Sequence, residues 1–333
     1  MRHFIFFAVI ISLTIISTIY VKNKFAESLI AEKTVQKVDP KDVIHVFFGV
    51  DDNYVKYLSV TMASILKNTK SPVFFHILDD RIAEETKKKL LKLRKYKDFS
   101  IEFVPVDYAQ ALALPETIQP HVSKTSYYRL QISSRNPKLK KCIYSDADLV
   151  FVSDIKELWD TDVEDFYMAA VPDPSDKKRA DLWFKVYPIS SNEHYVNAGI
   201  LVLNLEKWRQ NNAETKFYDA AAKYNDNIPY PDQDLLNIAL HDKIKYLNPR
   251  FDAMPEVVYF SLPEQFEAFE SPAIIHWAGQ YKPWNNPDTR LSEHFWEYVK
   301  LSPFAPEIYT DFYLSQLGIS NRKMFLKLCN LIP

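Results

Sequence analysis

Two aspartates one residue apart interrupt an apolar stretch near the middle of the chain. Asp146 and Asp148 follow the β-favouring residues Cys142–Tyr144, and apolar residues resume at once over 149–152. The pattern predicts a buried strand that ends in an acidic tip. Two buried carboxylates must be neutralised, and a hard divalent cation is the usual way, so the pair predicts a metal site.

The Asp-x-Asp spacing alone is weak, since the chain contains it three times. Asp160 and Asp162 lie in a polar stretch, where solvated turn residues are the simpler interpretation. The third copy begins at Asp232. Only Asp146 and Asp148 interrupt an apolar segment, and this context favours a ligand role for that pair.

Two more stretches place polar residues at the ends of expected elements. Asn197 and Gly199 come just before the apolar run 200–203, where a strand would begin, although an inert turn explains Gly199 almost as well. Asp232 and Gln233 would open a helix. Asp232 is then either a helix N-cap or, with Gln233, a partner for sugar hydroxyls.

The stretch Ile274–Trp284 combines three groups that suit a metal and a phosphate. An apolar strand ends at His276, Gly279 permits close approach of the backbone, and Lys282 follows just before a proline. A lone core histidine is the default interpretation of His276. The combination instead favours an imidazole for a metal, with a glycine and an ammonium group for phosphates.

These residues need a scaffold that brings them together, and the chain from Val43 onward alternates strands and helices. Apolar runs predict strands over 43–50, 73–78 and 101–106, separated by helices over 55–66 and 82–96. Such alternation implies crossovers, so the predicted fold class is α/β with a mainly parallel sheet. Ligands bind such sheets beyond the carboxyl ends of the strands. The chain has no Gly-x-Gly-x-x-Gly or Walker-type loop, which argues against dinucleotide dehydrogenases and P-loop enzymes.

The composition is that of an ordinary globular protein. The chain has 333 residues, 47% of them hydrophobic and 25% charged, which is enough to bury a substantial core. A formal net charge of -2 gives no argument for a nucleic-acid partner. The two cysteines, Cys142 and Cys329, lie far apart and imply no disulfide framework.

The N-terminal stretch predicts a membrane anchor. Residues 4–21 carry no charge, and the length of this stretch is at the short end for a membrane span. A cleaved signal peptide is the alternative. The lysines that follow outnumber Arg2, so the bulk of the chain is expected on the cytosolic face, with the secretory-pathway lumen as the alternative. The predicted organisation is an anchor over 1–22, a polar tether over 23–42, a folded domain over 43–303 and a helical tail over 304–333.

The C-terminal tail mixes basic and apolar residues. Arg322, Lys323 and Lys327 lie among large apolar side chains. Two hypotheses fit this pattern about equally well: a basic amphipathic helix on a membrane surface, and a helix packed on the core.

Six short motifs, in this order along the chain, resemble glycosyltransferase family 8. They are Phe48–Tyr54, Thr125–Leu130, Tyr144–Asp148, Tyr195–Gly199, Asp232–Asn237 and His276–Trp284. Each is weak singly, but the ordered set is specific and covers about 43–303. The resemblance implies a GT-A, Rossmann-like fold and retaining transfer of glucose or galactose from a UDP-sugar with Mn²⁺, or Mg²⁺ as the alternative metal. Among the branches of the family, the motifs most resemble those of bacterial enzymes that extend lipopolysaccharide, which implies a glycan or glycolipid acceptor.

The resemblance also implies roles for individual residues. Asp146, Asp148 and His276 match the metal ligands, while Gln233, Asp232 and Lys282 are the candidate catalytic residues. The matching donor-binding positions are Val50, Asp51, Asn53, Tyr54, Arg129, Asp146, Ala147, Asp173, Asn197, Asp232, Gln233, Gly279 and Lys282.

The mechanism and two other protein classes remain open on the sequence alone. Retention needs either a covalent intermediate, for which a carboxylate would be expected below the anomeric carbon, or front-face attack. Gln233 is a poor nucleophile, which favours front-face attack.

A metal-dependent phosphohydrolase would also use Asp146, Asp148 and His276, and a catalytically silent glycan-binding scaffold could keep the same fold.

Overall fold

The computed structural model describes most of the chain between residues 42 and 318. Within these bounds it leaves out 107–113, 115–123, 175–186, 188, 191–192, 225–227, 258 and 260. Residues 43–333 form a unit separate from residues 1–42.

A seven-stranded sheet forms the centre of this unit. In order across the sheet, its strands are β3 (Ser100–Pro105), β2 (Val73–Asp80), β1 (Ile44–Asp51), β4 (Lys141–Ser145), β7 (Val196–Asn204), β6 (Met168–Pro172) and β8 (Ile244–Tyr246). All neighbours pair in parallel except where β7 meets β4 and β6. The prediction of an α/β fold with a mainly parallel sheet is confirmed.

The reversal of β7 decides where the polar residues meet. Strands β1 and β4 end at one edge of the sheet, and β7 begins at that same edge because it runs in the opposite direction, with Ser145 paired to Ile200. Just beyond β4, a two-stranded sheet pairs β5 (Leu149–Phe151) with β9 (Ile274–His276), and Leu149 lies opposite His276. The acidic tip, the start of β7 and the end of β9 therefore converge.

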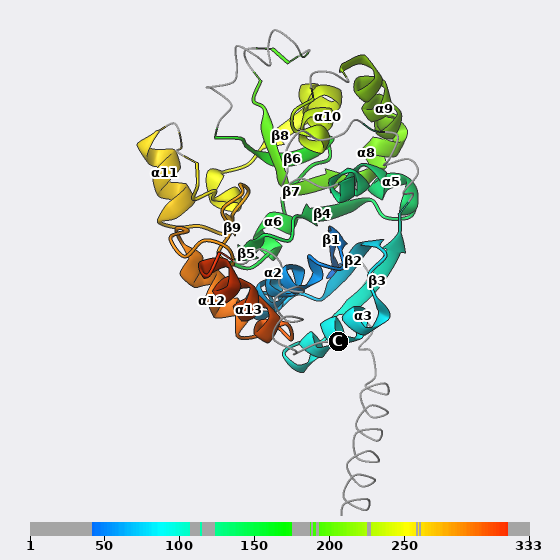
Figure 1. Cartoon of the computed structure of the whole chain (residues 1–333). Coiled ribbons are helices and arrows are strands. Elements are labelled where there is room, and N and C mark those ends of the chain that lie inside the picture. The colour runs from blue at the N-terminus through cyan, green and yellow to red at the C-terminus, as the bar shows by residue number, and fades with distance from the viewer. Residues whose placement is uncertain are drawn as a thin grey trace, which may run out of the picture. The chain divides into compact units, whose positions relative to one another are not determined.

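Helices cover both faces of the sheet. Figure 1 shows α12 and α13 beside α2 on one side, and α8, α9 and α10 around β7 and β6 on the other. The α-helices are α2 (Val55–Asn68), α3 (Glu84–Leu90), α5 (Ile132–Arg135), α6 (Lys156–Trp159), α8 (Leu205–Gln210), α9 (Ala213–Tyr224), α10 (Pro231–Leu240), α11 (Leu262–Phe269), α12 (Ser292–Val299) and α13 (Ala305–Gln316). Four 3₁₀ segments complete the described elements: η2 (Leu91–Lys95), η3 (Lys124–Gln131), η5 (His241–Lys243) and η6 (Pro249–Asp252).

Two apolar cores follow from the alternation of side chains along the strands. In β1, Val46 and Phe48 join the core under α2, whereas Phe47 joins the core under α8, α9 and α10. Strand β7 divides its side chains in the same way. The sheet is therefore buried on both faces, which is why its strands are almost continuously apolar in sequence.

The membrane anchor predicted over residues 4–21 requires correction. Across the part of the chain that the structure describes, no helix is long and apolar enough to cross a membrane, and residues 4–21 lie outside that part. An uncharged stretch at the short end of the spanning length does not by itself establish a transmembrane helix. We therefore withdraw the single-pass anchor, the cytosolic-face localisation that rested on it, and the membrane as a partner.

Two other expectations are resolved within the described residues. Asp232 is not the N-cap of α10: Tyr230 holds that position and Pro231 opens the helix, so the carboxylate of Asp232 is left for other contacts. Asp160 and Asp162 lie in and just beyond the turn after α6, as predicted for solvated turn residues. The basic part of the C-terminal tail, 319–333, lies outside the described residues.

Candidate metal and sugar-nucleotide site

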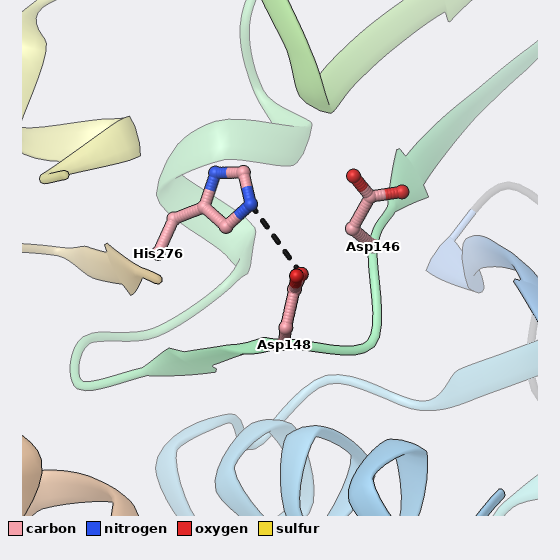
Figure 2. A group of neighbouring side chains, drawn as sticks. All are labelled: Asp146, Asp148 and His276. Carbon is pink, nitrogen blue, oxygen red and sulfur yellow. Dashed lines mark ion pairs between the residues drawn. The ribbon is translucent and has the colours of Figure 1, made fainter. Parts of the chain in front are cut away.

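The acidic tip lies on the short connection between β4 and β5. The backbone N–H of Asp146 donates to the carbonyl of Gly199 at 2.8 Å, and the carbonyl of Asp148 accepts from the N–H of Trp277 at 3.1 Å. The two carboxylates are therefore fixed against the start of β7 and the end of β9. Figure 2 shows their side chains turned toward the imidazole of His276.

Asp146, Asp148 and His276 form a group that fits a divalent cation. Their ligand atoms lie within 4.8 Å of one another, and His276 Nε2 is 3.4 Å from Asp148 Oδ1. That oxygen is buried and has no hydrogen-bond partner among the described residues, which a cation would provide. Two carboxylates and one imidazole suit Mn²⁺ or Mg²⁺ with phosphate oxygens completing the shell.

Arg129, from η3, links the acidic tip to the start of α10. One guanidinium nitrogen donates to Asp146 at 2.7 Å, the Nε lies 3.1 Å from Asp232, and a third nitrogen donates to the carbonyl of Ala198. The guanidinium lies over the ring of Tyr144, whose hydroxyl donates to Asp146 at 2.9 Å. Burial raises the pKa of Asp146 to about 6, although Arg129 opposes the shift.

Lys282 contacts the second carboxylate of the tip. Its Nζ lies 2.5 Å from Asp148 Oδ2 and also donates to the carbonyl of Trp277. Burial alone would raise the pKa of Asp148, but Lys282 and His276 outweigh it and hold this pKa below its ordinary value. Each carboxylate of the tip thus has its own cationic partner.

The loop that carries Lys282 is held by aromatic side chains at the start of α2. Trp284 stacks on Tyr57 with ring centroids 3.8 Å apart, and it meets Tyr54 edge to face at 6.2 Å. The backbone N–H of Tyr54 donates to Asp51 Oδ1 at 3.0 Å, where β1 ends. These contacts join the end of β1 to the Lys282 loop.

The polar residues of α10 meet the start of β7 and the end of β6. Gln233 donates to Asp173 Oδ2 at 3.1 Å and accepts from the N–H of Ala198 at 3.0 Å. Asn197 Oδ1 accepts from the N–H of Gly199 at 2.7 Å. Gln233 therefore links Asp173, just after β6, to the backbone at the start of β7.

Gly199 lies within β7, so the inert turn is the wrong interpretation. A Cβ built on Gly199 would lie 2.2 Å from Cε1 of the His276 ring, closer than atoms of a folded protein approach. The glycine is what allows His276 to face the acidic tip. A Cβ on Gly279, by contrast, meets no heavy atom within 4 Å, so that position has room for a side chain.

A cavity of about 490 Å³ gathers these residues. Of the predicted site residues, only Asn53 is absent from its walls, and that side chain is exposed. The structure thus brings together Val50, Asp51, Tyr54, Arg129, Asp146, Ala147, Asp148, Asp173, Asn197, Asp232, Gln233, His276, Gly279 and Lys282.

Several residues of this site were not predicted from the sequence. Tyr230, Met254 and Val257 also line the cavity, and Asp252 contacts His276 from behind with Oδ1 at 2.8 Å from Nδ1. The proline that opens α10 could have drawn attention to Tyr230 just before it. The other three lie in η6 and the loop after it, where the sequence has no periodic pattern.

Comparison with known proteins identifies the family. The profile of Glycosyl transferase family 8 matches residues 45–288. An inferred glycosyltransferase of Haemophilus influenzae is 31% identical over 75% of this chain and 76% of its own length. A lipopolysaccharide 1,2-glucosyltransferase of Escherichia coli is 27% identical over 85% of each chain.

A solved glycosyltransferase structure is also similar to this chain. The galactosyltransferase LgtC, crystallised in complex with donor and acceptor sugar analogues, superimposes with a TM-score of 0.69 and 28% identity. The superposition covers 77% of this chain and 95% of LgtC. With its sheet, its acidic tip and its sequence all in agreement, the chain belongs to glycosyltransferase family 8.

Proposed function

We propose that this glycosyltransferase moves a hexose, glucose or galactose, from a UDP-sugar to a glycan or glycolipid with retention of configuration. The observation that carries the proposal is the convergence of Asp146, Asp148 and His276 beside Lys282 in one cavity. The names of the relatives, which include lipopolysaccharide glucosyl- and galactosyltransferases, support a lipopolysaccharide-core acceptor. The catalytic domain would span 43–303, with 304–333 as a tail.

The chemistry follows from where charge develops during transfer. As the bond from the anomeric carbon to phosphate breaks, the diphosphate gains negative charge and the sugar ring gains positive charge. A bound Mn²⁺ would neutralise the diphosphate. Lys282 would donate to a phosphate oxygen, and the Asp146–Asp148–His276 group would hold the metal. Loss of the leaving group is therefore the step that these residues assist most.

The sugar side of the cavity would orient the donor. Asp173, Asn197 and Asp232 provide oxygens that could accept from sugar hydroxyls, and Arg129 fixes the carboxylate of Asp232 through their ion pair. Gln233 matches the position where a covalent mechanism would need its nucleophile, but an amide is a poor nucleophile. We therefore favour front-face attack, in which the leaving diphosphate takes the proton of the acceptor hydroxyl.

Calorimetry tests the donor. UDP-glucose, UDP-galactose and GDP-mannose are titrated into the protein with Mn²⁺ and with EDTA. The proposal predicts Mn²⁺-dependent binding of a UDP-hexose that is lost in Asp148→Asn. Asp162→Asn, in the exposed second copy of the motif, is the matched control and should bind as wild type does. A folded protein that binds no nucleotide sugar would exclude the transferase and favour the glycan-binding scaffold.

A further inference from the structure

Behind the metal-binding group lies a buried carboxylate that none of the assigned roles uses. Asp252 is fully buried and ends the 3₁₀ segment η6. Its Oδ1 is 2.8 Å from Nδ1 of His276, while Nε2 on the other side of the same ring faces Asp148 at 3.4 Å. The imidazole is thus held between a carboxylate that faces the cavity and one that does not.

The backbone fixes this geometry as firmly as the side chains do. The N–H of Ala253 donates to the carbonyl of Ile274 at 2.9 Å, and the N–H of His276 donates back to the carbonyl of Ala253 at 2.8 Å. The hydroxyl of Tyr259 donates to the carbonyl of Asp252 at 2.7 Å. Ala253 therefore forms a parallel bridge to Ile275, the residue before His276 in β9, which fixes the neighbouring Asp252 against the end of that strand.

We infer that Asp252 is a positioning residue for the metal: it holds the His276 ring so that Nε2 is presented to the cation, and its charge makes that nitrogen a better ligand. A carboxylate behind a metal-binding histidine has both effects in proteins generally, and its removal typically weakens metal binding by about 10- to 100-fold. The inference rests on the metal site of the proposed function. Asp252 does not line the cavity, so it would act on the metal only through His276.

Two substitutions separate the hydrogen bond from the charge. Asp252→Ala removes both and should weaken Mn²⁺ binding by about 10- to 100-fold. Asp252→Asn keeps an oxygen that can accept from Nδ1–H but loses the charge, so it should weaken Mn²⁺ binding less than Asp252→Ala does. Asp234→Asn is the matched control, because Asp234 is equally buried but contacts Tyr195 instead of His276.

Mn²⁺ affinity is measured on the full chain, without nucleotide, from the electron paramagnetic resonance signal of the free ion. Electron spin echo modulation of bound Mn²⁺ then reports a coordinated imidazole nitrogen. We expect this modulation in the wild type and in Asp234→Asn, and its weakening in Asp252→Ala even when UDP holds Mn²⁺ in place. In a His276→Gln background, replacing Asp252 should reduce the affinity no further.

Each outcome separates the metal site from the role of Asp252. A folded wild-type protein that binds no Mn²⁺ would overturn the proposed metal site and this inference with it. Wild-type binding together with unchanged affinity and nitrogen modulation in Asp252→Ala would overturn the inference alone. If Asp252→Ala does not fold, unchanged affinity in Asp252→Asn would overturn the role of the charge.

Discussion

At the scale of single residues, the site is a set of buried charges in which each has a partner. Arg129 forms ion pairs with Asp146 and Asp232, and Lys282 forms one with Asp148. His276 lies between Asp148 and Asp252. Unpaired charges in such a place would be costly, so removal of one member should disturb its partners as well. Two residues beside this network allow sharper predictions.

Gln233 decides between the two retaining mechanisms. Its amide contacts Asp173 and the N–H of Ala198, beside the residues proposed to hold the sugar. If front-face attack is correct, Gln233→Ala should lower kcat by about 10- to 100-fold through lost positioning, and no glycosylated protein should accumulate. Mass spectrometry of the intact protein after incubation with donor checks the second point. Loss of all turnover, or a trapped adduct at this position in the wild type, would favour the covalent route.

Asp234 should give the protein a measurable pH dependence of stability. Burial raises its pKa from 3.8 to about 7, despite hydrogen bonds from the Tyr195 hydroxyl at 2.5 Å and the Tyr230 N–H at 2.8 Å. The folded protein thus keeps a proton that the unfolded chain releases, so wild-type stability falls as pH rises through this window.

Asp234→Asn removes that titration. Relative to wild type, the free energy of unfolding of Asp234→Asn should rise by about 4 kcal/mol between pH 4 and pH 8. Urea unfolding of both proteins at several pH values measures the difference. A constant difference at all pH values would show that Asp234 titrates normally.

At the scale of elements, the site depends on how closely β7 approaches the end of β9. Gly199→Ala would put a methyl group into the His276 ring, so the ring must turn away. We expect at least a roughly tenfold loss of Mn²⁺ affinity, by the same loss of ligand orientation as above. Gly279→Ala is the matched control, because its methyl group meets no heavy atom within 4 Å. Equal Mn²⁺ affinities of the two variants would show that the close approach is unimportant.

The stack of Trp284 on Tyr57 should hold the Lys282 loop in place for the donor. Trp284→Leu keeps apolar bulk but removes an aromatic pair, so the Kd for UDP should rise by about three- to tenfold, with Mn²⁺ affinity unchanged. Trp296→Leu is the control, because Trp296 stacks on Tyr309 of α13 and not on Tyr57 at the start of α2. Titration of UDP into both variants in the presence of Mn²⁺ makes the comparison. Equal Kd values would contradict the role of the stack.

The sequence predicted those elements whose pattern is local. The strand before Asp146, the start of α10 and the end of β9 at His276 all show in runs of a few residues. The reversal of β7 does not, because strand direction depends on pairing between distant segments. The contact of Gly199 with His276 follows from that reversal, and Asp252 lies in a short segment with no pattern, so neither could be placed beforehand.

At the scale of the whole molecule, the residues that line the cavity all lie within the part of the chain that the family profile matches. The residues that line the cavity span 49–282, and the family profile matches 45–288. Helices α12 and α13 follow the matched part, yet they pack against α2, whose first turn adjoins Tyr54. We therefore expect these two helices to stabilise the donor side of the site without contacting the donor.

Transfer of a hexose from a UDP-sugar, with a metal held by Asp146, Asp148 and His276, can be measured directly. Proton NMR follows UDP-glucose and UDP-galactose with the full chain, Mn²⁺ and a lipopolysaccharide-core glycan. We predict that one donor is converted to UDP and an α-linked product, that EDTA stops the conversion, and that Asp148→Asn lowers it by at least about 100-fold. A folded protein that binds Mn²⁺ but leaves both donors intact, or converts one equally well in EDTA, would contradict the proposed function.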